Sequence, residues 1–102
     1  MSTSTIEKPE NLSKPKQRLC PRYKIIMHND NITTTNFVVA VLRAVFNKPE
    51  AEALKIMWEI HNEERALVGL YALEHAELKR DQVHSTARAR GFPLTCTIEP
   101  NE

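Results

Sequence analysis

Hydrogen-bonding side chains are concentrated directly after the first apolar segment of the chain. Asn29, Asp30 and Asn31 follow the string YKIIMH, and three threonines stand at positions 33–35. His61 lies on the apolar side of a later helical segment. Asn and Asp often only cap local turns, and a histidine on an apolar face is commonly a satisfied core residue.

Taken together, these residues suit the recognition of a protein N-terminus. A buried α-ammonium group needs an acceptor for each of its three N–H donors. The amide oxygens of Asn29 and Asn31 and a neutral nitrogen of His61 can supply them. Asp30 would add negative potential nearby. Apolar residues around this cluster predict a small pocket for one side chain, and methionines suit it because they repack around different guests. These wall residues are Met27, Val38, Met57, Ile60 and Leu94.

Other chemistry has little support in the sequence. There is no nucleophile elbow, no glycine-rich phosphate loop and no paired Cys/His cluster, so we expect neither a metal nor a cofactor. Cys20 and Cys96 are not spaced as a metal-binding or redox pair, and we expect reduced thiols. A small hydrolase that uses Cys96 and a histidine remains an alternative.

Composition limits the classes of partner. The chain has 102 residues and a formal net charge of +1, which argues against bulk binding to nucleic acid or to a membrane surface. No apolar run approaches the ~20 residues that span a bilayer. We therefore expect a cytoplasmic monomer. Residues 1–22 contain three prolines and little to bury, which predicts a flexible N-terminal extension before a single domain over 23–102.

The sequence pattern predicts that the domain has the element order β-α-α-β-α-β. The pattern predicts strands at 23–28, 66–71 and 93–99, and helices from the threonines at 33–35 to Phe46, over 49–63 and over 73–90, where Gly91 stops the last helix. The expected fold is an α/β (α+β) sandwich, in which three helices pack on a small, mostly antiparallel three-stranded sheet. In the later helices we expect Leu54, Trp58 and Leu73 to face inward.

Four blocks of the sequence resemble the ClpS family, whose members are adaptors of the ATP-dependent Clp protease. They are YKIIMHNDNITTTNFVVAVLRAVF, MWEIHNE, ALVGLYALEHAELK and FPLTCTIEP, in that order and at family-like spacing. The resemblance implies the same βααβαβ fold and a function without catalysis. Such proteins bind substrates that begin with a hydrophobic or aromatic residue (N-degrons) and deliver them to the unfoldase ClpA or ClpC.

By position, the resemblance also assigns roles to residues. Asn29, Asp30 and His61 would bind the α-amino group. The side-chain pocket would be formed by Met27, Thr33, Val38, Met57, Ile60 and Leu94. Glu74 and Lys79 would dock onto the unfoldase.

Two residues depart from the family pattern. Asn31 stands where an acid is usual, which replaces a charge-assisted hydrogen bond by a neutral one. Thr35 stands where a methionine often narrows the pocket, which predicts altered specificity. The main alternative function is a docking domain that binds the unfoldase without reading N-termini, since a fold alone does not decide function.

Overall fold

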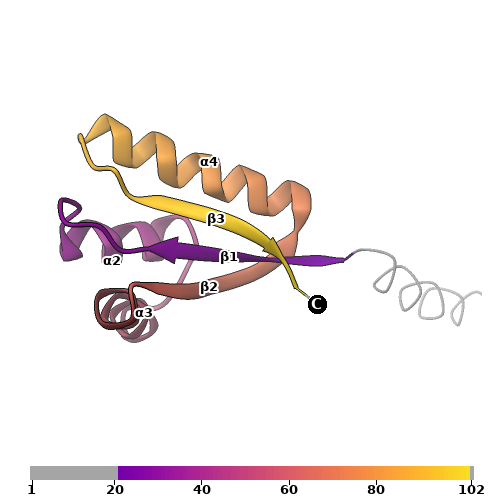
Figure 1. Ribbon diagram of the computed structural model, residues 1–102, viewed down its shortest axis with the longest axis horizontal. Coiled ribbons are helices and arrows are strands. Elements are labelled where there is room, and N and C mark those ends of the chain that lie inside the picture. The colour runs from indigo at the N-terminus through magenta and orange to yellow at the C-terminus, as the bar shows by residue number, and fades with distance from the viewer. Residues whose placement is uncertain (1–20, 102) are drawn as a thin grey trace, which may run out of the picture.

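The protein consists of a three-stranded antiparallel sheet and three helices that pack against it (Figure 1). The computed structural model describes residues 21–101. The elements in chain order are β1 (Arg22–His28), α2 (Thr35–Ala44), α3 (Glu50–Glu63), β2 (Arg65–Ala72), α4 (Leu73–Ala89) and β3 (Thr95–Pro100). The predicted fold is confirmed. The flexible extension predicted for 1–22 lies outside the described residues, except that Arg22 already belongs to β1.

The central strand of the sheet is β1, and the strand order is β2-β1-β3. Both pairings are antiparallel, with Met27 opposite Ala66 on β2 and Cys96 on β3. A bulge in the β2 pairing falls between Ile25 and Ile26 of β1. Because successive strand residues point to opposite faces, the buried residues Ile25, Met27 and Cys96 share the face that meets the helices.

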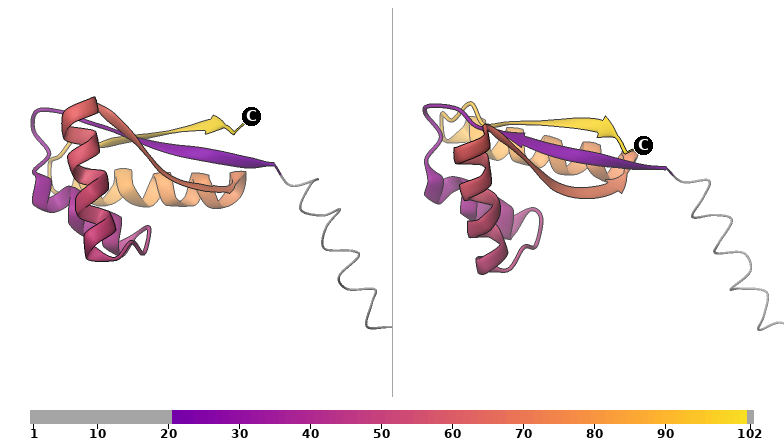
Figure 2. Two further views of the ribbon diagram at one scale, coloured as in Figure 1. Left: turned by 90° about the horizontal axis from the view of Figure 1, so that it is seen from below. Right: turned by 60° about the horizontal axis from the view of Figure 1, so that its bottom comes forward.

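One helix covers a face of the sheet, and the other two lie at its end. Figure 2 shows α4 along one face, with α2 and α3 beside the end at which β1 finishes. The core runs between them, and its members include the fully buried Leu42 of α2 and Val83 of α4. This arrangement brings the loop after β1 next to both α2 and α3. None of the helices within residues 21–101 is long and apolar enough to cross a bilayer.

Local signals fix the helix ends. The Thr34 hydroxyl accepts a hydrogen bond from the Phe37 N–H at 3.2 Å and caps α2. Gly91 follows α4 with φ +80°, and the N–H groups of Gly91 and Phe92 donate to the carbonyls of Arg88 and Ala87. The predicted stop at Gly91 is therefore confirmed.

Three side chains expected in the core lie at the surface instead. Leu54 and Trp58 of α3 are 39% and 53% exposed, and Leu73 of α4 is also exposed. Only one side of α3, formed by Ala53, Ile56, Met57 and Ile60, is buried. The inward orientation expected for Leu54 and Trp58 is wrong, because α3 lies at the end of the sheet and, within residues 21–101, packs against neighbours on one side.

The last strand is shorter than predicted. It begins at Thr95, whereas the alternating pattern had suggested position 93. The Arg88 guanidinium donates from Nη1 to the carbonyl oxygens of Phe92 and Leu94, both at 2.8 Å. These contacts hold the connection after α4 against the helix end, and the chain joins the sheet only beyond them.

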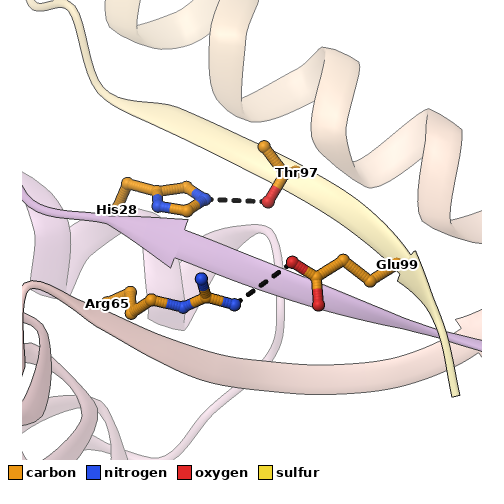
Figure 3. Close-up of polar contacts among 4 residues, drawn as sticks. All are labelled: His28, Arg65, Thr97 and Glu99. Carbon is orange, nitrogen blue, oxygen red and sulfur yellow. Dashed lines mark hydrogen bonds and ion pairs between the residues drawn. The ribbon is translucent and has the colours of Figure 1, made fainter.

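The outer face of the sheet carries polar side chains that bond to one another (Figure 3). His28 Nε2 and Thr97 Oγ1 share a hydrogen bond of 2.8 Å. The Arg65 guanidinium forms an ion pair of 3.1 Å with Glu99 and so joins β2 to β3 across β1. By the register, Ile26 lies midway along this diagonal, and it is only 5% exposed although it points away from the helices.

Candidate functional site

A cavity of about 260 Å³ lies where the loop after β1 meets α2 and α3. The loop contributes Asn29, Asp30, Asn31 and Thr33, α2 contributes Thr35 and Val38, and α3 contributes Met57, Ile60 and His61. The volume is below the 300–1,000 Å³ of a typical drug-sized site, so it suits a single side chain. Polar residues of the loop, joined by Thr35 and His61, therefore share one hollow with apolar residues of the two helices.

Asp30 organises the loop. Its Oδ1 accepts from the Ile32 and Thr33 N–H groups at 2.8 and 2.7 Å, and its Oδ2 accepts from the Thr33 hydroxyl at 2.7 Å. Partial burial acts to raise the pKa of Asp30, but these hydrogen bonds and the charge of Arg88 outweigh it, so the pKa lies below its ordinary value. The carboxylate remains charged, but three of its acceptor positions are used within the loop.

Asn29 is fixed by the residue that ends α3. Its backbone N–H donates to the Glu64 carbonyl at 2.9 Å, and its side-chain Nδ2 lies 3.5 Å from Glu64 Oε1. A carboxylate can only accept, so the amino group of the Asn29 amide faces Glu64. The carbonyl oxygen of the same amide is left without a hydrogen-bond donor among residues 21–101 and can accept one from a ligand.

His61 and Asn31 have open hydrogen-bonding groups. No hydrogen bond joins either side chain to another residue within 21–101, and both are exposed. The exposed Trp58 ring packs edge-on against the His61 imidazole, with centroids 5.7 Å apart and an interplanar angle of 84°. Since His61 lies in the last turn of α3, the negative end of the helix dipole favours a cation beside it.

The apolar wall comes from Val38, Met57 and Ile60, all buried. Thr33 and Thr35 also line the cavity. Met27 and Leu94 were expected in this wall, but they are fully buried and do not belong to the cavity lining. They form part of the core cluster that includes the wall residues. The structure thus brings together nine of the eleven residues predicted for the α-amino and side-chain sites.

Comparison with known proteins identifies the family of this chain. A family model described as ATP-dependent Clp protease adaptor protein ClpS matches residues 18–97. The chain belongs to the ClpS family. It is 48% identical to the ATP-dependent Clp protease adapter protein ClpS of Desulfatibacillum aliphaticivorans, over 87% of this chain and 88% of that protein. The corresponding protein of Myxococcus xanthus is 44% identical, over 88% and 86% of the two chains.

A solved structure agrees with the fold of this ClpS-family protein. Agrobacterium tumefaciens ClpS2 bound to L-phenylalaninamide superposes with a TM-score of 0.78 at 33% identity, covering 80% of this chain and 99% of that one. The resemblance seen in the sequence is confirmed as family membership. Adaptor is also the role that the names of the curated relatives give.

The surroundings of Cys96 do not favour its use as a nucleophile. Burial raises the pKa of the Cys96 thiol to about 12, which keeps it protonated and poorly nucleophilic. His84 Nε2 accepts from the backbone N–H of Cys96 at 3.0 Å, so this ring binds the backbone rather than activating the sulfur. Within the described residues, no group of three His, Cys, Asp or Glu side chains gathers as a metal site would require. Cys20 lies outside those residues.

The two residues assigned to unfoldase docking differ in their surroundings. Glu74 is exposed in the first turn of α4, and Leu78, one turn further on, is also exposed. Lys79 is half-buried, and its ammonium group donates to the Val45 carbonyl at 2.8 Å and lies near the Phe46 and Tyr71 rings. Lys79 thus holds α4 against the end of α2, whereas Glu74 faces solvent.

Sequence reasoning missed Glu64 as a neighbour of the site. The residue ends α3 in the left-handed conformation, where glycine is usual, so the sequence carries no sign of a special backbone there. Its partner Asn29 is 35 positions away along the chain. Only a correct placement of the end of α3 beside the end of β1 would have found the contact.

Proposed function

We propose that this protein binds the free N-terminal residue of other proteins in the 260 Å³ cavity and delivers those proteins to a Clp unfoldase. The observation that carries the proposal is the composition of the cavity rim and wall. Three open acceptors, on Asn29, Asn31 and His61, border one apolar hollow of single-residue size. That combination matches a charged amino group attached to a hydrophobic side chain.

The α-amino group supplies the first half of the selectivity. An α-ammonium donates three hydrogen bonds, one for each acceptor on the rim. Acetylation removes the charge and two of the donors. It would therefore lose hydrogen bonds from a charged group, each worth about 1.5–3 kcal/mol. Binding should therefore require an unblocked N-terminus.

The first side chain supplies the second half. Burying a large apolar side chain against Val38, Met57 and Ile60 is worth about 1.5–3 kcal/mol. The ligand in the Agrobacterium tumefaciens structure, L-phenylalaninamide, combines a free α-amino group with an aromatic side chain, and we transfer that class of ligand to this cavity. Thr35 at its lining is short and β-branched, so we expect branched first residues to be admitted as well.

Delivery requires a second surface. We place it on the exposed part of α4 around Glu74 and Leu78, with the N-terminal domain of ClpA or ClpC as the partner. Lys79 lies beside this surface, and we include it in the docking site. Its ammonium group already donates to a backbone carbonyl within the protein. The protein itself would act without catalysis, in the cytoplasm and as a monomer.

Peptide titrations test the proposal. Peptides that differ only in the first residue, each with a free and an acetylated N-terminus, would be titrated into the protein by fluorescence anisotropy or calorimetry. We expect affinity for free Leu, Phe, Tyr or Trp N-termini and a loss of at least about tenfold on acetylation. Equal affinity for free and acetylated peptides would show that the protein does not recognise the α-amino group.

Substitution of Asn29 distinguishes this function from the docking-only alternative. Asn29→Ala should weaken binding to N-terminal peptides and leave binding to the unfoldase N-terminal domain unchanged. A docking module without an N-terminal site would show no peptide preference to lose. Unfoldase binding without any peptide binding by the unsubstituted protein would therefore favour the alternative.

A further inference from the structure

Glu64 has an uncommon backbone conformation next to the cavity. Its φ is +74°, in the left-handed region where an L-residue other than glycine is strained. In this conformation its N–H donates to the Ile60 carbonyl at 2.9 Å, and its own carbonyl accepts from the Asn29 N–H at 2.9 Å. The turn thus connects α3 to β2 and ties the end of α3 to the end of β1. Glycine would make the same turn without strain.

The side chain provides what glycine lacks. Glu64 Oε1 lies 3.5 Å from Asn29 Nδ2, at the long limit of a hydrogen bond. An asparagine amide can rotate by half a turn and exchange its oxygen and its amino group, which reverses its role from acceptor to donor. A carboxylate on one side favours the orientation that places the amino group toward it, because a carboxylate can accept but not donate. The Asn29 oxygen is then directed away from Glu64.

The Glu64 carboxylate is not neutralised by a neighbouring cation. Two ion pairs occur within residues 21–101, Arg65–Glu99 and Arg80–Asp81, and neither includes Glu64. Arg65, the next residue along the chain, is directed to β3 instead. Glu64 is not part of the cavity lining, but it brings a negative charge next to Asn29, which is. Within that lining, Asn31 provides only a neutral amide and the Asp30 carboxylate is already bonded within the loop.

We propose that Glu64 is a positioning residue for substrate binding, which orients the Asn29 amide as an acceptor and adds negative potential for the α-ammonium group. The inference rests on the proposed function, because it names how the same site is prepared for its ligand. Glycine at this position would relieve the backbone strain and lose the side-chain contact at the same time. Stability and binding should therefore move in opposite directions when the side chain is removed.

Three variants separate these contributions. Glu64→Gly removes both strain and carboxylate, so we expect Tm to rise by roughly 4 °C and the affinity for a free-Leu peptide to fall about fivefold. Glu64→Gln keeps an acceptor oxygen without the charge and should bind with intermediate affinity at an unchanged Tm. Glu63→Gln is the matched control, because it removes the neighbouring charge on α3 and should change neither quantity.

Two results would overturn the inference. If Glu64→Gly raised Tm and bound the peptide as tightly as the unsubstituted protein, the residue would be only a strained helix end. If it lowered Tm and affinity together, the side chain would have a general structural role. Either result leaves the proposed function intact as long as the unsubstituted protein prefers free over acetylated peptides, whereas loss of that preference would count against the proposed function itself.

A measurement without ligand tests the contact directly. The side-chain amide resonances of Asn29 in a ¹H–¹⁵N spectrum should shift in Glu64→Gly and remain in place in Glu63→Gln. An Asn29 side-chain signal that does not respond to Glu64→Gly would show that the carboxylate does not hold the amide, and it would refute the positioning role independently of any peptide.

Discussion

The cavity rim and the outer face of the sheet are both polar surfaces, and each includes a histidine, but their hydrogen bonding differs. On the outer face, His28 pairs with Thr97 and Arg65 pairs with Glu99 (Figure 3). On the rim, His61 and Asn31 have no hydrogen-bond partner within residues 21–101. The outer face uses its polar groups to link strands, whereas the rim keeps several of them available.

Structural and binding residues of a small domain can be distinguished by whether their polar groups already have hydrogen-bond partners within the protein. Polar side chains that bond to one another are explained by the fold, because their contacts link neighbouring strands and each adds modest net stability. Open acceptors that converge on an apolar hollow lack such an explanation. Asp30 lies between the two cases, because it lines the cavity and yet its hydrogen bonds hold its own loop.

Peptide affinity should change most when the histidine of the rim is removed, and least when that of the outer face is removed. His61→Ala removes an acceptor from a charged ligand, which is worth about 1.5–3 kcal/mol, so peptide affinity should fall ~10- to 150-fold. The matched variant His28→Ala should bind peptide normally and lose at most about 1 kcal/mol of stability. Calorimetric titration and thermal unfolding measure both quantities. Equal loss of affinity in the two variants would remove the distinction between the surfaces.

A smaller effect is expected for specificity. Thr35→Met adds bulk at the cavity lining, so peptides beginning with Ile should lose about tenfold in affinity relative to those beginning with Leu. Thr97→Met makes the same change on the outer face and should leave the ranking unaltered. Competition between Leu, Ile, Phe and Trp peptides measures the ranking. An unchanged order in Thr35→Met would show that position 35 does not set specificity.

A third histidine, His84, should make the stability of the fold depend on pH. Burial first, and then the charges of Arg88 and Arg80, lower the pKa of His84 below the ordinary 6.5, while its Nε2 accepts from Cys96 N–H. The unfolded chain therefore takes up this proton at a higher pH than the folded protein. The stability contributed by His84 should be complete above pH 6.5 and decline as the pH falls below it.

Chemical denaturation above and below pH 6.5 measures that decline. His84→Gln, which can still accept the Cys96 hydrogen bond but does not titrate, should flatten this part of the profile. A decline toward acidic pH that persisted unchanged in His84→Gln would show that His84 is not its source.

The smallest effect is expected at the ion pair of the outer face. The Arg65 and Glu99 side chains are 52% and 40% exposed, so a double-mutant cycle with alanine should give a coupling of ~0.2–1 kcal/mol. Unfolding in urea at low and high salt measures the coupling and its screening. The single variants should bind N-terminal peptides normally. A larger effect on binding than on stability would extend the binding surface to this face.

The sequence alone determined the elements and their order, because local rules act over a few residues. The threonines at 33–35 predicted a cap for α2, Gly91 predicted the end of α4, and the apolar periodicity identifies each helix and strand. Which of the threonines caps the helix, Thr34, is seen only in the structure. It also identified the chemical types at the cavity, since Asn29 and His61 lie beside apolar segments. The blocks that resemble ClpS were enough to name the family.

The tertiary structure decided which faces are covered and which polar groups remain open. Helical periodicity defines the sides of α3, but Trp58 is exposed because no helix or strand of the described part of the chain lies against that side. Met27 and Leu94 are in the core rather than at the cavity surface for the same kind of reason. The contact of Glu64 with Asn29 depends on where two distant segments end, and no local pattern encodes a meeting of that kind.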